Sequence, residues 1–273
     1  MSRIKFLSAA VGALAFISSS SVMAQACSIA AWSNAATTTA TAALPAGNGR
    51  YSGSCAAVVA AAGPNSFVVD NSPTAETSYR ARFYAFTADL GGAEADIFQA
   101  QNAANANIIR VTYTAGTGFR FYVNGAAAGA SLGTIPAVAG RWYGIEVRWA
   151  NNGTFTAIAR GNAQAAPAQP QITAPAFSNA ADRIETARLG ILTTTGVTGG
   201  MRFDDFDSRR TTDIGFLPRG DANASGGVNI ADAVAIRNET FAGGTLAPGP
   251  ADCNENGTVN ISDAVCIRNL TQP

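Results

Sequence analysis

The 273-residue sequence contains no histidine, and its only lysine is Lys5. The absence of histidine excludes Ser-His-Asp and Cys-His catalysis, HExxH zinc sites and an imidazole pH switch. If Lys5 is removed with a targeting segment, a Schiff-base lysine and a phosphate-binding GK[ST] loop are excluded as well. What stays available is acid–base chemistry on Asp and Glu, chemistry at a site of oxygen ligands, or binding without chemistry.

Charged residues are also scarce, because Asp, Glu, Lys and Arg make up only 13% of the chain. Without residues 1–26 the chain would keep 16 arginines (17 minus Arg3) against 18 acidic residues, a net charge of −2. This balance is not that of a polybasic nucleic-acid binder, so no nucleic-acid partner is expected. No later segment is apolar over the ~20 residues that a membrane span requires.

The first 26 residues have the pattern of a signal peptide. Arg3 and Lys5 precede a short apolar run over residues 6–17, a serine cluster and the sequence Ala24-Gln25-Ala26. We therefore expect a secreted, bacterial protein whose mature chain begins near Cys27. A lipid anchor on Cys27 is the alternative, although Gln25 fits a lipobox poorly.

Residues 27–213 are rich in β-branched and aromatic runs separated by Gly, Asn and Pro turns. The clearest predicted strands are Tyr79–Thr87, Ile108–Tyr113, Gly118–Val123, Trp142–Trp149, Thr154–Arg160, Arg188–Leu192 and Met201–Phe206. Many short strands without helical intervals favour a two-sheet jelly-roll sandwich, so the fold class is mainly β.

Alternation along these strands separates apolar core candidates from a second face that carries arginine, glutamate and flat aromatics. We predict that this second face forms a wet groove that contacts a ligand, since aromatics stack on sugar rings and arginine hydrogen-bonds hydroxyls or carboxylates. An ordinary polar sandwich face is the alternative. The ligand candidates are Arg82, Tyr84, Arg120, Tyr122, Trp142, Glu146 and Arg148.

After a connector over residues 214–218, an internal repeat occupies residues 219–273. Residues 221–238 and 252–269 are identical at 12 of 18 positions, with a spacing of 31 residues. Each copy reads as an Asx- and Gly-rich loop followed by a short helix, in which Val234 and Ile236, or Val265 and Ile267, are the apolar positions.

The loops place oxygen ligands at the spacing of an EF-hand, with glycine at the sharp turn (Gly226 and Gly257). Ion-free Asx turns that cap the helices are the alternative. Only two ligands in each loop are carboxylates, so weak calcium sites of about 10⁻⁴–10⁻³ M are expected. The predicted ligands are Asp221, Asn223, Ser225, Gly227, Asn229 and Asp232 in the first loop, and Asp252, Asn254, Asn256, Thr258, Asn260 and Asp263 in the second.

The paired D-x-N-x-[NDS]-G-x-[IV]-N-x-x-D loops, each followed by one helix, resemble a type I dockerin domain. The resemblance covers about the last fifth of the chain and implies two bound calcium ions and docking to a cohesin module, usually in polysaccharide degradation. The positions that it implies for cohesin contact are Ile230, Ala231, Arg237, Asn238, Ile261, Ser262, Arg268 and Asn269. The Ser-Thr and Lys-Arg pairs of that family are absent here, and solvated helix arginines are the alternative.

Four cysteines allow three pairings. Pairing within each half of the chain is the simplest choice in an oxidising compartment, giving Cys27–Cys55 and Cys253–Cys266. The first repeat has Ala222 and Ala235 where the second has Cys253 and Cys266, which is the joint loss that a bonded pair predicts. Free thiols are the alternative.

The β region resembles a concanavalin A-like or laminin-G-like jelly roll, through RWYGIEVRW (141–149), ARLGIL (187–192) and GGMRFDDFDS (199–208). This resemblance implies glycan or protein binding, with glycoside hydrolases and polysaccharide lyases among the relatives. The E-x-D-x-x-E strand signature of laminarinase-like hydrolases is missing. Three roles are open for the acidic residues near the end of this region, Asp204, Asp205 and Asp207. They could be solvated acids, form a third calcium site or supply a catalytic pair, and the last is the least expected.

We therefore expect a non-catalytic carbohydrate-binding or adhesion protein that a calcium-dependent dockerin attaches to a cohesin-bearing partner. A polysaccharide-degrading glycoside hydrolase with a divergent carboxylate pair is the second hypothesis. A structural surface protein, whose dockerin packs on its own β domain, is the third. A carboxylate facing Glu146 across the groove would favour the hydrolase.

Overall fold

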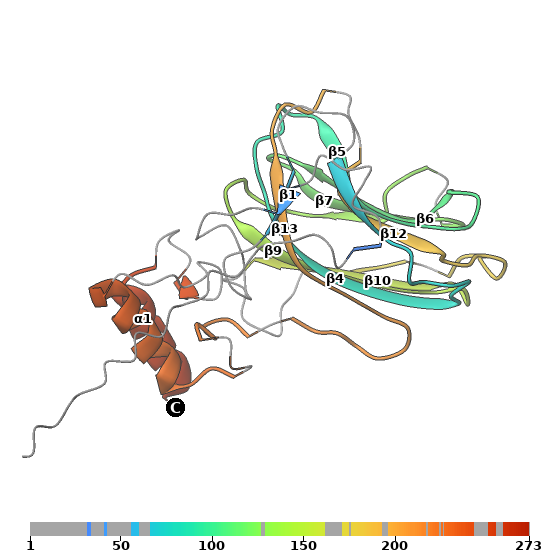
Figure 1. The fold of residues 1–273 in the computed structure, drawn as a ribbon. Helices are drawn as coiled ribbons and strands as arrows, with labels where there is room; N and C mark the ends of the chain where they lie inside the picture. Colours follow the sequence, from blue (N-terminus) through green and yellow to red (C-terminus); the bar gives the residue numbers. More distant parts are fainter. Residues whose placement is uncertain are drawn as a thin grey trace, which may run out of the picture.

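The structure, a computed structural model, describes residues 32–33, 41–42, 56–59, 66–126, 129–161, 171–174, 176–192, 196–216, 218–223, 225, 227–242, 251–254 and 259–272. Two antiparallel β-sheets pack face to face, and two helices follow at the C-terminal end (Figure 1). The prediction of a mainly β, two-sheet sandwich is confirmed.

The seven-stranded sheet is the lower layer in Figure 1 and has the order β1-β2-β13-β4-β9-β10-β11. Its long central strands alternate apolar and polar residues, which fits a sheet with one face in the core. The strands are β1 (Thr41–Ala42), β2 (Ala57–Val59), β13 (Met201–Arg209), β4 (Ser78–Phe86), β9 (Trp142–Ala150), β10 (Thr154–Gly161) and β11 (Gln171–Thr173).

The six-stranded sheet is the upper layer and has the order β3-β12-β5-β6-β7-β8. Its strands are β3 (Ser66–Asp70), β12 (Thr186–Ile191), β5 (Glu94–Gln101), β6 (Asn107–Thr114), β7 (Gly118–Val123) and β8 (Gly133–Ile135). All seven strands predicted from the sequence are present with bounds shifted by at most three residues, whereas β3, β5 and β8 in this sheet were not predicted.

Aromatic side chains from both sheets fill the space between them. Phe83 of β4 stacks on Phe98 of β5 with ring centroids 5.3 Å apart, and both rings are fully buried. Phe119 of β7 contacts Tyr113 of β6 and Tyr143 of β9. The inward faces of these strands are therefore the ones that alternation predicts, and their polar residues point away from the core.

The two helices are α1 (Ile230–Ala242) and α3 (Ile261–Thr271). They pack around a small apolar cluster that includes Ile236, Ile267 and Cys253. Val234 and Val265 are exposed, so only the isoleucine of each predicted apolar pair reaches this core. No helix within the described ranges is long and apolar enough to cross a membrane.

Candidate functional site

A β-bulge in β5 determines which side chains reach the outer face of the six-stranded sheet. Its register with β6 shifts between Asp96 and Phe98, so that Ile97 and Phe98 are both buried in the core. An extra residue in one strand displaces the alternation that follows it by one position. The residues that share the outer face are Glu94, Asp96, Gln99 and Gln101.

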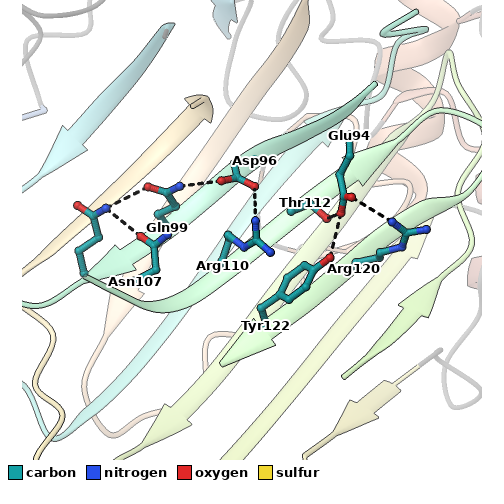
Figure 2. A network of polar contacts seen from close by, with 9 residues as sticks. Glu94, Asp96, Gln99, Asn107, Arg110, Thr112, Arg120 and Tyr122 are labelled. Carbon is teal, nitrogen blue, oxygen red and sulfur yellow. Dashed lines mark hydrogen bonds and ion pairs between the residues drawn. The ribbon is translucent and has the colours of Figure 1, made fainter. Parts of the chain in front are cut away.

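Glu94 is the centre of one polar cluster on this face (Figure 2). Its Oε1 accepts hydrogen bonds from Thr112 Oγ1 at 2.5 Å and Tyr122 Oη at 3.0 Å, while its Oε2 accepts from Arg120 Nη1 at 3.1 Å. Burial alone would raise the pKa of Glu94, but these hydrogen bonds and the Arg120 charge outweigh it and lower the pKa. The carboxylate is therefore held in its charged form.

Asp96 joins a second cluster beside the first (Figure 2). It accepts from Arg110 Nη1 at 3.2 Å and from Gln99 Nε2 at 2.9 Å. The chain of hydrogen bonds continues through Gln101, whose Nε2 donates to Gln99 Oε1 and Asn107 Oδ1. Linked side chains of this kind hold one another in fixed orientations.

The Arg110 guanidinium lies over the Tyr122 ring, 3.9 Å from its centroid. Strand pairing places Arg188, Gln99, Arg110 and Tyr122 directly side by side on β12, β5, β6 and β7. Four adjacent strands span about 14 Å between the outer two. The face thus carries a row of planar, polar side chains that runs across the strands, with hydrogen-bond donors and acceptors along it.

A hollow of about 490 Å³ adjoins this row at the end of the β6–β7 hairpin. Arg110 and Tyr122 line it together with Asn107, Asn124 and Gly125. Its volume lies within the ~300–1,000 Å³ of sites for small molecules. The row and the hollow together form the candidate site, which we call the six-strand face.

The outer face of the seven-stranded sheet is different, because residues 210–216 lie across it. We call these residues the covering segment; Figure 1 draws this part of the chain in orange below β4. Asp213 pairs with Arg80 of β4 and, at 3.3 Å, with Arg148 of β9. Two salt bridges to neighbouring strands attach the covering segment to this face.

Glu146 of β9 lies beneath the covering segment and is 1% exposed. Its Oε1 accepts from Arg148 Nε at 2.6 Å, and its Oε2 accepts from the backbone N–H of Gly215 at 3.0 Å. Arg82, opposite Glu146 on β4, donates to the Gly215 carbonyl at 3.3 Å. A buried carboxylate with these partners holds the chain in place and has no access to a polysaccharide.

Phe216 completes the cover on the apolar side. Its ring packs against Tyr84 and Trp142, and the Arg160 guanidinium lies 4.7 Å from the ring centroid. Gly144 leaves room for this ring, because a Cβ there would come within 2.6 Å of Phe216 Cδ1. Burial lowers the pKa of Arg160.

The structure does not bring the predicted groove residues together on one surface. Arg120 and Tyr122 lie on the six-strand face, where they help to bind Glu94. The other five lie on the opposite sheet, beneath or beside the covering segment: Arg82, Tyr84, Trp142, Glu146 and Arg148. The expectation of a single groove is wrong, because alternation assigns a residue to the outer face of its sheet without saying which sheet it is in.

The sequence analysis missed Glu94, Asp96, Gln99 and Arg110. The bulge interrupts the alternation of polar and apolar residues in β5 at Ile97 and Phe98. The sequence pattern therefore did not identify residues 94–101 as a strand. A signal was nevertheless present, since E-A-D-I-F-Q (94–99) departs from E-x-D-x-x-E only by Gln99 in place of the last glutamate.

The first repeat loop folds its oxygen-bearing side chains towards one another. The Ser225 N–H reaches both Asp221 Oδ1 at 2.8 Å and Asn223 Oδ1 at 3.0 Å. Ser225 Oγ lies 3.1 Å from the Gly227 carbonyl, and Asn229 Nδ2 lies 3.5 Å from the same oxygen. Asp221, Asn223, Ser225 and Gly227 therefore lie together in the loop, whereas Asn229 Oδ1 accepts from the Ala231 N–H at 2.8 Å, as in the Asx-turn alternative.

Asp232 closes this loop from the helix. Its two carboxylate oxygens accept from the backbone N–H groups of Asn223 at 3.0 Å and Asn229 at 2.8 Å. The second repeat has the same geometry, with Asp263 accepting from Asn254 at 3.0 Å and Asn260 at 2.9 Å. Asp221, Asp232 and Asp263 are fully buried, which is costly for charged carboxylates unless they are paired or bind a metal.

The donor set fits a hard cation, since each oxygen has further lone pairs for an ion. Asp252, Asn254, Asn260 and Asp263 are described, whereas Asn256 and Thr258 lie outside the described residues. In the described ranges no three His, Cys, Asp or Glu side chains gather at one metal-binding point, so Asp204, Asp205 and Asp207 form no such cluster. Asp207 instead pairs with Arg209 at 2.9 Å.

The predicted Cys253–Cys266 disulfide is confirmed, with Cα atoms 5.9 Å apart. Arg219 supports it by donating from Nε to the Cys253 carbonyl at 2.6 Å. The bond joins the second loop to α3 across 13 residues. The other predicted pair, Cys27–Cys55, lies outside the described residues.

Each helix presents an exposed stripe at matching repeat positions. Ile230 is 63% exposed and its counterpart Ile261 is 49% exposed, and Val234 and Val265 follow one turn later. The other predicted partner residues are exposed as well: Ala231, Arg237, Asn238, Ser262, Arg268 and Asn269. Positions i, i+4, i+7 and i+8 share one side of a helix, so these residues form two similar surfaces.

No protein-family model matches the sequence, and no curated protein sequence matches it. Among solved structures, an endo-β-1,4-glucuronan lyase from the fungus Trichoderma reesei is similar over 67% of this chain and 92% of its own, with 12% identity and a TM-score of 0.46. The cellulose-induced protein Cip1 is similar over 64% of this chain and 88% of its own, with 16% identity and a TM-score of 0.47.

Alginate lyase AlgAT5, from polysaccharide lyase family 7, is similar over 57% of this chain and 79% of its own, with 8% identity and a TM-score of 0.41. These neighbours are β-sandwich jelly-roll proteins. At such identities and scores the likeness concerns the strand arrangement, and no functional residue is transferred from them. The class that the fold defines is a jelly-roll β-sandwich, and its six-strand face carries linked polar side chains.

Proposed function

We propose that this chain is a secreted, non-catalytic carbohydrate-binding protein whose ligand lies on the six-strand face. The observation that carries the proposal is the pair of Arg110 and Tyr122, which line the hollow and contact each other, with Asp96 and the buried Gln99 behind them. Fixed donors and acceptors suit sugar hydroxyls, which both donate and accept. Orientation by neighbouring side chains lowers the entropy lost when a ligand binds.

Gln99 supports binding without hydrolysis. Glycoside hydrolysis needs one carboxylic acid that protonates the leaving oxygen and a second carboxylate as nucleophile or base. Glu94 and Asp96 supply carboxylates on the face, but both are engaged as acceptors of charge-assisted hydrogen bonds. Gln99 stands where E-x-D-x-x-E has its last glutamate. Its side chain is a carboxamide, which has no acidic proton to give.

The test is binding of the full chain to a panel of polysaccharides, with reducing-sugar release measured in parallel. We expect Tyr122→Ala to weaken binding at least about tenfold, because it removes both the ring and the hydroxyl that holds Glu94. Arg141→Ala is the matched control and leaves binding unchanged, because Arg141 is exposed and lies directly before β9 of the other sheet. Release of sugar by the wild-type chain would favour the hydrolase hypothesis instead.

We further propose that the two repeat loops bind calcium and form a dockerin-like module. The converging oxygens of the first loop and the buried Asp232 and Asp263 support this. Calorimetry with CaCl₂ should give two weak sites near about 10⁻⁴–10⁻³ M, and Asp232→Ala should remove one. A nanomolar affinity, or no calcium binding by the wild-type chain, contradicts the proposal.

The disulfide makes the two loops respond differently to calcium removal. We expect the backbone amide protons of the first loop to exchange rapidly with solvent when a chelator removes calcium. The second loop should keep its structure, and its slow exchange, because Cys253–Cys266 joins it to α3. Reduction should abolish this difference. Equal exchange of both loops under oxidising conditions would show that the disulfide does not stabilise the second site.

The exposed stripes on α1 and α3 support docking to a cohesin-type module. Because the stripes are similar, either helix could take the same position against a partner. A pull-down with cohesins should therefore tolerate Ile230→Asp or Ile261→Asp alone and fail with both. Complete loss from one substitution alone would contradict two equivalent orientations, and an absence of binding to any cohesin would favour the structural surface-protein hypothesis.

A further inference from the structure

The hollow of the six-strand face has little charge. Of the side chains that line it, only Arg110 is charged, and the others are asparagines, Tyr122 and small or apolar residues. Asn124 is itself engaged, since its Nδ2 lies 3.0 Å from both oxygens of Asp182. The charged groups that a ligand meets at the hollow are therefore Arg110 with its partner Asp96 and, behind Asn124, the Asp182 carboxylate.

Carboxylates on β5 already neutralise Arg110, which lines the hollow, and Arg120 on the same sheet face. Arg110 is paired with Asp96 at 3.2 Å, and Arg120 is paired with Glu94 at 3.1 Å. Arg188 is the remaining arginine of the row, but it lies two strands away on β12, where it contacts Asn105 and the Phe67 ring. The hollow itself therefore has no uncompensated positive charge.

A uronate would be disfavoured here for two reasons. Its carboxylate can only accept hydrogen bonds, and Asp96 already occupies one edge of the Arg110 guanidinium. It would also lie close to the Asp96 carboxylate, whose side chain is only 15% exposed and so is weakly screened by solvent. A hydroxyl meets neither obstacle, since it can accept from Arg110 and donate to a carboxylate or amide oxygen.

We propose that the hollow accepts an uncharged sugar residue of a neutral polysaccharide, and that the Asp96–Arg110 pair excludes acidic polysaccharides. This specificity rests on the proposed carbohydrate-binding function. In this proposal Asp96 determines the specificity, because its carboxylate neutralises the positive charge of Arg110. A binding site whose charges are balanced should also be insensitive to salt.

The experiment compares the full chain on two groups of soluble polymers. The neutral group is hydroxyethylcellulose, mixed-linkage β-glucan, xylan and mannan, and the acidic group is alginate, polygalacturonate and glucuronan. We expect the wild-type chain to bind a neutral polymer at least about tenfold more tightly than any acidic one. Its affinity should change less than about twofold between ~0.05 and ~0.5 M NaCl.

Asp96→Asn is the decisive variant, because it removes the compensating charge and keeps one acceptor oxygen, which can serve either Arg110 or Gln99. Binding to acidic polymers should appear or rise at least about tenfold at low salt, and should fall again as salt screens it. Asp207→Asn is the matched control, because it makes the same change in the Asp207–Arg209 pair of the other sheet. It should alter neither preference.

The outcomes separate the specificity from the function. Tighter binding of the wild-type chain to an acidic polymer, lost in Tyr122→Ala, overturns the specificity and leaves carbohydrate binding at this face intact. Suppose that Asp96→Asn has the circular dichroism spectrum of the folded chain but gains no binding to acidic polymers. That result overturns the proposed role of Asp96. Binding to neither group contradicts the proposed function itself and the specificity with it.

Discussion

The two sheets of the sandwich carry similar polar residues on their outer faces, and the chain uses them in opposite ways. On the six-stranded sheet Glu94 and Arg120 are both about one-third exposed and lie on an open surface. On the seven-stranded sheet Glu146 has an arginine partner as well, but residues 210–216 cover it and bury it completely. The same pair of residue types is therefore partly exposed to solvent in one sheet and forms an internal attachment in the other.

The difference arises from what approaches each face. The covering segment brings a backbone donor at Gly215, a carboxylate at Asp213 and an aromatic ring at Phe216. These groups satisfy the polar side chains beneath them and exclude solvent. On the six-strand face the side chains of the sheet satisfy one another, and Glu94, Arg110 and Arg120 stay about one-third exposed.

The largest effect that should separate the two faces comes from removing a glutamate on each. Glu146→Ala leaves the Gly215 N–H and Arg148 without their acceptor, and we expect it to lower the free energy of unfolding by about 2–3 kcal/mol. The loss stays below the ~3–5 kcal/mol of a fully buried pair because Arg148 is 34% exposed and can be hydrated.

Glu94→Ala on the six-strand face is the matched comparison. Its partners can turn to water, so the free energy of unfolding should fall by less than about 1 kcal/mol, while carbohydrate binding is lost. Urea titration of both variants measures the difference. Equal destabilisation by the two substitutions would mean that the covering segment contributes little to folding.

A methyl group at Gly144 should have the next largest effect. The Cβ of Gly144→Ala would lie 2.6 Å from Phe216 and 2.9 Å from Tyr84, so the ring must move. We expect a loss of about 1–3 kcal/mol, as for other substitutions that overfill a packed site. Thermal and urea unfolding measure it.

Two further variants make the source of this loss clear. Gly161→Ala, in the neighbouring strand, meets Tyr143 only at 3.4 Å and should be neutral. Phe216→Ala should reduce the loss caused by Gly144→Ala, since the nearest ring is gone and only the contact with Tyr84 at 2.9 Å remains. If Gly144→Ala costs the same in both backgrounds, the clash with Phe216 is not the cause.

Local patterns in the sequence predicted the strands whose alternation is regular. β7 lies at the predicted Gly118–Val123, and β4, β9 and β10 differ from prediction by only one residue at either end. The repeat predicted the matching helices, and the paired loss of two cysteines predicted the disulfide. The alternation of each strand is a local signal, while the repeat adds a direct comparison between positions 31 residues apart.

The candidate site was less predictable for two physical reasons. A bulge shifts the outward positions of β5 by one residue, so a period-two pattern cannot connect Asp96 with Gln99. The burial of Glu146 depends on Gly215, 69 residues away, and no local pattern reports such a contact. Alternation therefore identified polar outer faces, while the covering segment decided which of them is open.

The salt bridges of Asp213 should contribute less than the buried contacts of the same segment. The Asp213 side chain is 59% exposed, so Asp213→Asn should lower the free energy of unfolding by less than about 1 kcal/mol. The loss should shrink further in ~0.5 M NaCl. A salt-independent loss above about 2 kcal/mol would show that Asp213, and not Glu146, is the main attachment.

The smallest effect concerns the pH dependence of the open face. The pKa of Glu94 is lowered in the folded chain, so its contribution is present above the ordinary glutamate pKa of about 4.3 and is lost as pH falls through the lower, folded pKa. Carbohydrate binding should therefore be constant from about pH 8 to 5 and fall only in more acidic solution. Because the side chain is 36% exposed, the accompanying change in stability is small.

Glu94→Gln separates this titration from general acid unfolding. The variant keeps one acceptor oxygen, for either Thr112 or Arg120, and has no titrating group, so its weaker binding should not depend on pH in the range where the wild-type affinity falls. Circular dichroism at each pH checks that the sandwich stays folded. A wild-type affinity that already declines near pH 6, or the same acid profile in Glu94→Gln, would show that another group controls the six-strand face.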